Sequence, residues 1–369
     1  MDSPYRNELL VAIGAVQQAV AISRAVLSVA DKGVVEKDDL SPVTVADFAI
    51  QALLTATIHN AFPSDRFVGE ETAADLRSDP VLLDRVWELL QGASRDGKAG
   101  AGTCEVPDTK DQVCEMIDWC GLGLPTASRE GSERVWVFDP IDGTKTFVRG
   151  EAYAVNIALL EGSRQVLSVV ACPTISEDAE APVANDTIDP TGRGCILFAV
   201  QGHGAYVRPL PGSPSELEAR RLPRHATAVT STEQLRSVTC FNLLDSGVDV
   251  VHKTITDRLG VPFPGCDLLG WVPRWAVLAL GLANMTVWVY KTRERHAKIW
   301  DHAGAILLFE EVGGKVTDVD GREIDWTAGR KLKSNFGFLA APPSLHETVL
   351  KTVHETLKEV GKASLLAHS

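Results

Sequence analysis

The spacing of apolar residues predicts helices and then strands in the first half of the chain. Apolar side chains recur every three to four residues in three segments, which predicts helices at 8–30, 44–60 and 81–91. Shorter apolar runs bounded by glycine turns predict strands at 135–138, 154–160, 166–172 and 195–200. We expect a mobile insertion at 92–111, which is rich in Gly, Ala and Asp, and a polar loop at 176–193.

In the second half of the chain, short apolar runs alternate with helical periodicity. The runs predict strands at 228–230, 285–290, 315–318 and 337–340. The periodic segments predict helices at 250–259, 271–282, 302–312 and 344–360. Alternation of this kind is typical of an α/β layer. A Pro-rich stretch at 208–224 marks a boundary, so we expect an α+β domain over 1–207 and an α/β domain over 208–369.

Length and composition indicate a globular protein that binds no nucleic-acid polymer. The 369 residues suit two packed subdomains, and 45% of them are hydrophobic and 23% charged. The net charge of −13 disfavours a nucleic-acid polymer as partner, because such binding needs a basic stripe. An acidic protein can still bind a small polyanion if divalent cations invert the local field.

The apolar N-terminal segment predicts a core helix and no membrane anchor. Residues 9–30 are the longest apolar stretch, but Gln17, Gln18, Ser23 and Arg24 interrupt it at helical spacing. The acidic, polar start of the sequence supports neither a secretory signal nor a transit peptide. Seven cysteines without a CxxC pair or a zinc spacing indicate reduced, buried thiols. We therefore expect a cytoplasmic protein.

Residues 136–147 combine the ligands of a hard cation within a few positions. They read Trp-Val-Phe-Asp-Pro-Ile-Asp-Gly-Thr-Lys-Thr-Phe. We expect Pro140 to end the ladder of the preceding strand and Gly143 to permit a tight turn into a helix. Asp139, Asp142 and the Ile141 carbonyl then offer oxygen ligands for Mg²⁺ beside amides that can bind phosphate. The alternative is an ordinary turn, since Asp-Pro and Asp-Gly pairs are common in turns that bind nothing.

Two further acidic segments also adjoin apolar stretches. Glu70 and Glu71 follow a short apolar run, and Asp301 precedes a long one. The alternatives are that Glu70 and Glu71 form a solvated surface pair and that Asp301 only caps the following helix. These alternatives do not explain why all three carboxylate groups adjoin apolar segments. The sequence therefore predicts one shared acidic pocket.

These motifs resemble the lithium-sensitive, magnesium-dependent phosphomonoesterase superfamily that includes inositol monophosphatase and fructose-1,6-bisphosphatase. The hallmarks are a Gly-Glu-Glu box, an Asp-Pro-Ile-Asp-Gly-Thr box and a later Trp-Asp, present here in that order across nearly the whole chain. The 3'(2'),5'-bisphosphate nucleotidase branch is the most similar. Its details are matched at 41–44 ahead of Asp47, at 147–151 and at 298–303. The resemblance implies a layered α-β-α-β sandwich.

The resemblance also implies a role for each matched position. The implied ligands of two or three Mg²⁺ ions are Glu70, Asp139, the Ile141 carbonyl, Asp142 and Asp301. Asp47 and Thr144 resemble the pair that orients and deprotonates the attacking water, and their alternatives are a helix-start aspartate and an N-cap threonine. The Gly143 and Thr144 amides would hold the phosphate, with Glu71 as a partner behind the ligands.

The substrate-binding region departs from the nucleotidase pattern. Gly270 and Trp271 stand where those enzymes carry a base-binding Asp and Ser. The candidate substrate contacts are Ser246 in the 244–249 stretch, Trp271, Arg274 and Lys298. Arg274 would replace a phosphate-contacting Lys and Trp271 would stack on a base. A buried core tryptophan and a surface arginine are the alternatives.

The sequence therefore predicts a Mg²⁺-dependent phosphatase for a small anionic phosphomonoester. The first hypothesis is removal of the 3'-phosphate of adenosine 3',5'-bisphosphate, or of its sulfated relative, with lithium inhibition implied by the resemblance. The second is hydrolysis of an inositol phosphate or another sugar phosphate at the same metal site. The third is a catalytically silent binding protein, which would have lost a carboxylate ligand, and none is missing here. We expect a monomer or homodimer.

Overall fold

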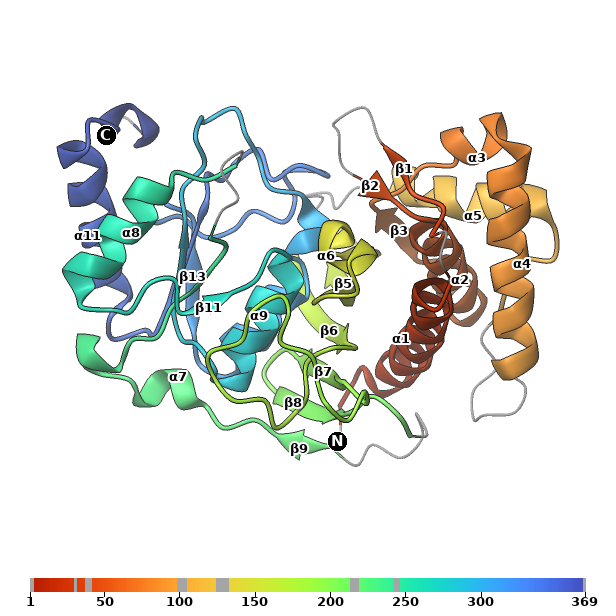
Figure 1. Cartoon of the computed structure of the whole chain (residues 1–369), viewed down its shortest axis with the longest axis horizontal. Helices are drawn as coiled ribbons and strands as arrows, with labels where there is room; N and C mark the ends of the chain where they lie inside the picture. Colours follow the sequence, from red (N-terminus) through yellow and green to blue (C-terminus); the bar gives the residue numbers. More distant parts are fainter. Residues whose placement is uncertain are drawn as a thin grey trace.

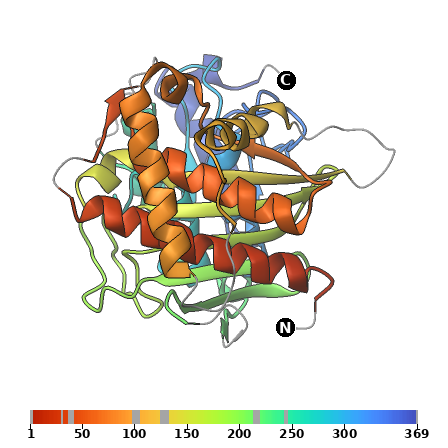
Figure 2. The same ribbon diagram turned by 90° about the vertical axis from the view of Figure 1, so that its right-hand side faces the viewer.

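Layers of helices and β-sheet alternate across the molecule. The computed structural model describes residues 3–29, 32–36, 42–97, 105–123, 133–212, 219–241 and 246–367. Helices α1 (Arg6–Leu27) and α2 (Val45–Ala61) cover one face of a seven-stranded sheet (Figures 1 and 2). Helices α9 (Trp271–Leu280) and α10 (Ala305–Glu311) cover its other face. This layering confirms the predicted sandwich.

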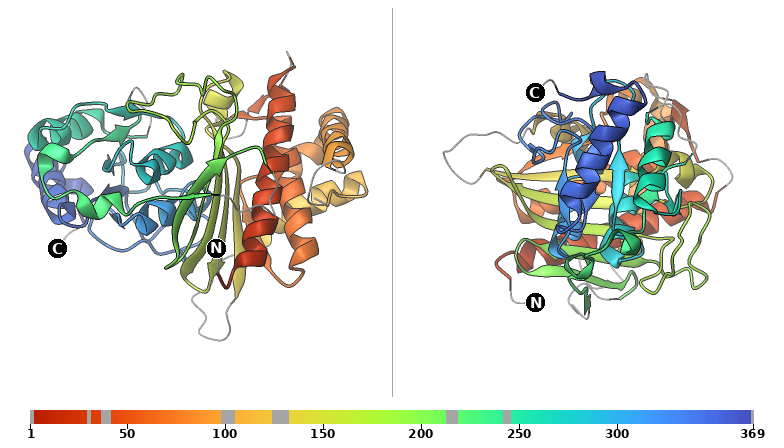
Figure 3. Two further views of the ribbon diagram at one scale, coloured as in Figure 1. Left: turned by 90° about the horizontal axis from the view of Figure 1, so that it is seen from below. Right: turned by 90° about the vertical axis from the view of Figure 1, so that its left-hand side faces the viewer.

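A second, smaller sheet and an outer pair of helices complete the layers. Its three strands are antiparallel in the order β12 (Thr286–Trp288), β14 (Phe338–Ala341) and β13 (Lys315–Thr317). Helix α11 (His346–Glu359) packs on β14 and on α8 (Asp249–Leu259). Figure 3 shows this half on one side of the large sheet and α1 and α2 on the other.

The large sheet follows the order of the chain. Its strands are β3 (Arg66–Gly69), β4 (Arg134–Asp142), β5 (Ala154–Glu161), β6 (Arg164–Cys172), β7 (Cys195–Val200), β8 (Gly204–Pro209) and β9 (Arg220–Arg221). β3 and β4 are parallel, and each later neighbour is antiparallel. Because helices cover both faces, the central strands are buried almost throughout.

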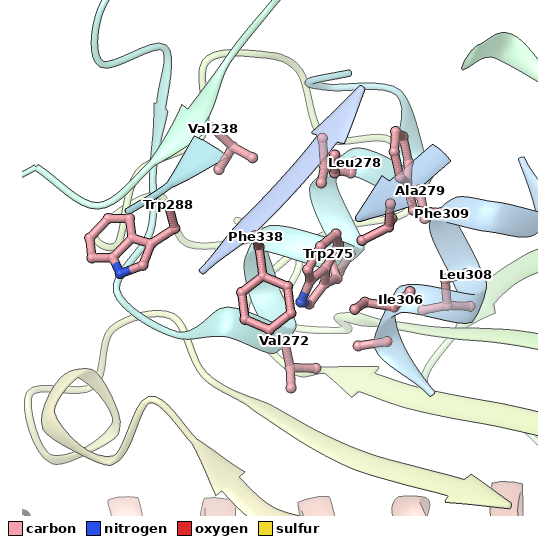
Figure 4. Close-up of a cluster of buried hydrophobic side chains, with 14 of the residues drawn as sticks. Val238, Val272, Trp275, Leu278, Ala279, Trp288, Ile306, Leu308, Phe309 and Phe338 are labelled. Carbon is pink, nitrogen blue, oxygen red and sulfur yellow. The ribbon is translucent and has the colours of Figure 1, made fainter. Parts of the chain in front are cut away.

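Alternate residues of the central strands enter two separate hydrophobic cores. On β4, Trp136 and Phe138 join the core under α1 and α2, whereas Val135 and Val137 join the core on the opposite face. This alternation follows from the two-residue period of a strand. Figure 4 shows part of the second core, in which Trp275 of α9 lies near Phe338 of β14. The sheet therefore separates the two cores and carries side chains into each.

Short elements fill the connections between the layers. The short strands are β1 (Val35–Glu36), β2 (Pro42–Val43), β10 (Val238–Thr239) and β11 (Cys266–Asp267). The remaining helices are α3 (Ala74–Ser78), α4 (Pro80–Gly97), α5 (Lys110–Leu122), α6 (Thr144–Val148) and α7 (His225–Ala228). Single 3₁₀ turns are η1 (Thr232–Gln234), η2 (Ile299–Asp301) and η3 (Ala363–Leu365).

Four details differ from the sequence prediction. The strand expected at 228–230 is wrong, because α7 ends at residue 228 and residues 229 and 230 belong to no strand. The helix expected at 302–312 begins only at Ala305, after η2. Pro140 does not end the ladder, since β4 continues to Asp142 through an irregularity. Within the expected insertion at 92–111, α4 continues to residue 97 and α5 begins at 110, whereas 98–104 lie outside the described residues.

Helix α1 is packed inside the structure. By length and hydropathy alone this helix is able to cross a membrane, and core helices of other proteins meet the same criteria. Here one face of the helix is buried: Leu9, Val16 and Val20 are at most 1% exposed, and the helix packs against α2 and the sheet. The domain boundary expected at 208–224 includes residues outside the described ranges, and it stays a prediction.

Candidate active site

Glu70, Asp139 and Asp142 lie at the carboxyl ends of two neighbouring parallel strands. Gly69, the last residue of β3, is paired with Phe138 of β4, so Glu70 and Asp139 follow side by side. On β5, Asp139 opposes Asn156 and Asp142 opposes Ala154. β4 therefore has one extra residue in this interval, which is a β-bulge. Since residues three apart on a regular strand point to opposite faces, the bulge allows Asp139 and Asp142 to share one side.

Asp301 reaches the same place from the second half of the chain. The Asn156 amide, opposite Asp139, donates to the carbonyls of Trp300 at 2.7 Å and Ala303 at 2.9 Å. The Gly304 amide donates to Gln165 Oε1 at 2.7 Å. These bonds attach the loop that carries Asp301 to strands β5 and β6. The acidic segments far apart in sequence are therefore adjacent in space.

The three aspartates form a cluster that needs positive charge. Ligand oxygens of Asp139, Asp142 and Asp301 all lie within 4.8 Å of one another. Burial raises the pKa of Asp139 and Asp301 well above the ordinary range, and the neighbouring carboxylates raise them further. Burial also raises the pKa of Asp142 to about 7, against a hydrogen bond from Val272 that lowers it. Like charges this close are stable together only when protonated or neutralised by a cation.

The donor set fits a hard divalent cation. Asp139 is 1% exposed, and its Oδ1 has no hydrogen-bond partner among the described residues. A buried carboxylate oxygen of this kind normally has a partner, and several carboxylates in one place are the usual ligands of Mg²⁺. Glu70, which is partly exposed, lines the adjoining cavity beside Asp142 and Asp301.

Glu71, the residue after Glu70, is buried. Its side chain belongs to a residue that is 4% exposed, so the solvated surface pair considered for Glu70 and Glu71 is wrong for Glu71. Gln51 of α2 accepts from the Glu71 amide at 2.8 Å and donates to its carbonyl at 2.9 Å. Arg330 donates to the Gly69 carbonyl at 2.7 Å. The end of β3 is therefore fixed from both halves of the chain.

Gly143 starts helix α6 directly after the aspartates. Its φ of 89° is the left-handed region that favours glycine, and its carbonyl accepts from the amides of Thr146 and Phe147. Gly143 is thus the N-cap, and the N-cap alternative considered for Thr144 is wrong. The Thr144 hydroxyl donates to the Ile141 carbonyl at 3.1 Å. This bond holds the hydroxyl at the mouth of the cluster.

Asp47 belongs to the first turn of α2 and is fully buried. Its Oδ2 accepts from the Thr44 amide at 2.8 Å and from the Thr44 hydroxyl at 2.7 Å, which forms a capping box. The helix-start alternative therefore describes its local structure correctly. Its charge also raises the pKa of Asp139, so Asp47 lies near the acidic cluster as well. The two interpretations of Asp47 are compatible.

A cavity of about 260 Å³ opens next to the aspartates. Acidic side chains on its lining are Glu70, Asp142 and Asp301, and basic ones are Lys145, Arg274, Arg295 and Lys298. The four predicted substrate contacts, Ser246, Trp271, Arg274 and Lys298, all line it. Sequence reasoning missed Lys145, Tyr290, Arg295 and His296. Lys145 lies inside the acidic motif itself, and the other three occupy 290–296, a segment with three arginine or lysine residues and one histidine after an apolar strand.

Helix α9 brings a further group of residues to the acidic cluster. The Val272 amide in its first turn donates to Asp142 Oδ2 at 2.7 Å, where the helix dipole favours a carboxylate. Arg274 is 1% exposed, so the surface arginine considered from the sequence is wrong. Trp271, in contrast, is partly exposed on the cavity.

A layered sandwich with clustered carboxylates at strand ends is typical of metal-dependent phosphatases, and the comparisons with known proteins agree. The chain belongs to the inositol monophosphatase family, which consists of Mg²⁺-dependent phosphatases. The sequence model of this family matches residues 5–358. This membership confirms the resemblance inferred from the motifs and the expected type of fold.

Individual relatives match over nearly their whole length. The chain is 31% identical to the 3'(2'),5'-bisphosphate nucleotidase of Emericella nidulans, over 96% of this chain and 99% of that protein. It is 33% identical to the 3'(2'),5'-bisphosphate nucleotidase of Schizosaccharomyces pombe, over 94% and 95%. Among solved structures, Thermotoga maritima IMPase matches with a TM-score of 0.57 and 19% identity, over 95% of this chain and 98% of that one.

Proposed function

We propose that this protein is a Mg²⁺-dependent phosphomonoesterase that hydrolyses the 3'-phosphate of adenosine 3',5'-bisphosphate, leaving AMP and phosphate. The observation that carries the proposal is the convergence of Asp139, Asp142 and Asp301 within 4.8 Å beside a cavity. The nucleotidase names of full-length relatives at 31% and 33% identity support the choice of substrate.

In this proposal the acidic cluster holds the cation. Two or three Mg²⁺ ions would be held by Glu70, Asp139, the Ile141 carbonyl, Asp142 and Asp301. When bound, Mg²⁺ supplies positive charge that polarises the phosphoryl group and lowers the pKa of water. Glu71 is the proposed partner behind these ligands, and Gln51 fixes its backbone through the amide and the carbonyl.

Asp47 and Thr144 are the proposed proton-handling pair. The Thr144 hydroxyl is oriented by its bond to the Ile141 carbonyl, so its oxygen is available to accept from an attacking water. Asp47 is the carboxylate that takes up the proton, and its Oδ2 is already positioned by Thr44. The amides of Gly143 and Thr144 at the start of α6 bind the phosphate that is cleaved.

The cationic side chains of the cavity fit the phosphate that is not cleaved. Lys145, Arg295 and Lys298 share the cavity with the acidic cluster, and Lys145 and Arg295 are exposed. A substrate with one phosphate needs charge only at the metal centre, whereas a bisphosphate needs a second cationic region. The proposed contacts for the rest of the substrate are Ser246, Trp271 and Lys298. Arg274, the fourth contact predicted from the sequence, packs its guanidinium against the Trp271 ring.

The test is a phosphate-release panel with Mg²⁺ and with EDTA. The substrates are adenosine 3',5'-bisphosphate, adenosine 2',5'-bisphosphate, inositol 1-phosphate, inositol 1,4-bisphosphate and fructose 1,6-bisphosphate. We expect the highest kcat/KM for adenosine 3',5'-bisphosphate and no release with EDTA. A higher kcat/KM for an inositol ester would replace this proposal by the alternative of an inositol phosphate phosphatase. The cytoplasmic location, the monomer or homodimer and lithium inhibition stay predictions.

A further inference from the structure

Arg274 is a buried cation whose hydrogen bonds go to the backbone. It is 1% exposed, and it donates through Nε to the Leu268 carbonyl at 2.8 Å and through Nη2 to the Leu269 carbonyl at 2.8 Å. Its guanidinium carbon lies 4.2 Å from the ring centre of Trp271 and 4.6 Å from that of Trp288. These two rings are nearly perpendicular, at 81°. One edge of the guanidinium is thus occupied by carbonyls, and the group is seated in the angle between two indoles.

The two carbonyls belong to residues 268 and 269, and each backbone amide and carbonyl of these two residues has a hydrogen-bond partner. The Leu268 amide donates to the Thr239 carbonyl at 2.9 Å. The Leu269 amide donates to Asn185 Oδ1 at 2.8 Å, and the Asn185 carbonyl accepts from the Ala152 amide at 2.8 Å. Arg274 therefore binds the Leu269 carbonyl and Asn185 binds the Leu269 amide. Asn185 also connects Leu269 to the loop that follows α6.

This segment leads directly into the first turn of α9, which contacts Asp142. The Val272 amide donates to Asp142 Oδ2 at 2.7 Å. Gly270 approaches the same oxygen so closely that a Cβ there would lie 2.5 Å from it. Because the backbone at 270–272 packs directly on the carboxylate, a shift of this turn by a few tenths of an ångström moves Asp142 or breaks its bond.

We propose that Arg274 is a positioning residue for the metal centre: through the Leu268 and Leu269 carbonyls it fixes the start of α9, and so the orientation of Asp142 towards the cation. Asn185 is the second positioning residue, acting on the same segment from the other side. The role in catalysis rests on the proposed function, since it concerns the same ligand cluster. It differs from the substrate contact predicted for Arg274 from the sequence, because its effect is on the metal and not on substrate affinity.

The experiment compares Arg274→Met, Arg274→Lys and Asn185→Ala with a matched control, Arg208→Met. Arg208 is also a buried arginine, 4% exposed, that donates to backbone carbonyls, those of Pro209 and Pro211, but it lies at the end of β8. Two quantities are measured: the Kd of Mn²⁺ in the absence of substrate, by calorimetry, and the separate kcat and KM for adenosine 3',5'-bisphosphate. Thermal unfolding monitors folding.

For Arg274→Met we expect the Mn²⁺ Kd to rise and kcat to fall about 10- to 100-fold, the range found when groups behind metal ligands are removed, with KM changed by less than about threefold. Arg274→Lys restores part of the loss, because an ammonium reaches one carbonyl but lacks the planar edge that binds both. Asn185→Ala weakens Mn²⁺ binding in the same direction, and Arg208→Met leaves both quantities unchanged.

The proposal is overturned if Arg274→Met raises KM with unchanged Mn²⁺ affinity, which is the signature of a direct substrate contact. If Arg274→Met does not fold, the Mn²⁺ Kd of Arg274→Lys and of Asn185→Ala tests the proposal instead. Wild-type Mn²⁺ affinity in both variants contradicts the proposal. If the wild-type protein hydrolyses no member of the substrate panel, the proposed function fails, while the comparison of Mn²⁺ affinities still tests Arg274.

Discussion

Asn156 connects the sheet to the loop that carries Asp301, and its replacement tests how the two halves of the site are joined. The side chain is fully buried on β5, and its amide nitrogen donates to the carbonyls of Trp300 and Ala303. Asn156→Leu keeps the number and branching of the side-chain heavy atoms but removes both hydrogen bonds. Two carbonyls are then left buried without this donor.

The magnitude follows from those two bonds. Each buried polar group that loses its partner costs about 1 to 3 kcal/mol, and the apolar leucine offsets part of the sum, so we expect unfolding free energy to fall by about 2 to 4 kcal/mol. The loop also loses its attachment opposite Asp139, so we expect the Mg²⁺ concentration for half-maximal activity to rise about 10- to 100-fold. Urea denaturation measures the first quantity and phosphate release at graded Mg²⁺ the second.

Ser168→Ala is the matched control for Asn156→Leu. Ser168 is fully buried on the neighbouring strand β6, and its hydroxyl has no hydrogen-bond partner within the described part of the chain. Its removal therefore costs little. The reasoning is refuted if Asn156→Leu and Ser168→Ala unfold at the same urea concentration and both retain the wild-type Mg²⁺ dependence.

Three further predictions concern the charge of one ligand, one buried histidine and the thiols. Asp142→Asn removes a ligand charge and should abolish phosphate release, so near-normal turnover would show that the cation site is assigned wrongly. Burial lowers the pKa of His252 from 6.5 to about 3. Because the unfolded chain binds this proton and the folded one does not, the contribution of His252 to stability is complete above pH 6.5 and is lost as the pH drops toward 3, by about 2 kcal/mol at pH 5. His252→Gln should flatten urea midpoints measured across this range, and an unchanged slope would contradict the assignment. In a Cys104→Ser background, the six described cysteines should react with a thiol reagent only on unfolding, since all six are buried and burial raises the pKa of Cys114, Cys266 and Cys120, that of Cys120 to about 12; rapid labelling of the native protein would contradict this.

The sequence predicted the acidic cluster because its signals are local. Asp139 and Asp142 fall in one short motif after an apolar strand, and Glu70 follows another. Strand ends that meet at one edge of a sheet bring such residues together, whichever loops intervene. The periodic patterns likewise predicted α1, α2 and strands β4 to β7 to within a few residues.

The remaining features depend on packing that no local pattern records. A proline inside an apolar strand argues for its end, yet Pro140 is accommodated because a bulge lies there. Helix α5 was missed, although Val113, Ile117 and Cys120 recur at helical spacing and are buried in the core. Arg274 had a readable signal, because it stands alone among apolar residues of α9, but its contacts with Leu268 and Leu269 depend on the tertiary structure.

The division of the proposed ligands between the two halves of the chain has a consequence for synthesis. Glu70, Asp139 and Asp142 emerge from the ribosome well before Asp301 and before α9, whose Val272 amide holds Asp142. The complete set of proposed ligands is therefore absent while the large sheet first assembles. In this proposal, binding of Mg²⁺ stabilises only the complete chain. The first half must therefore fold by means of its own apolar contacts.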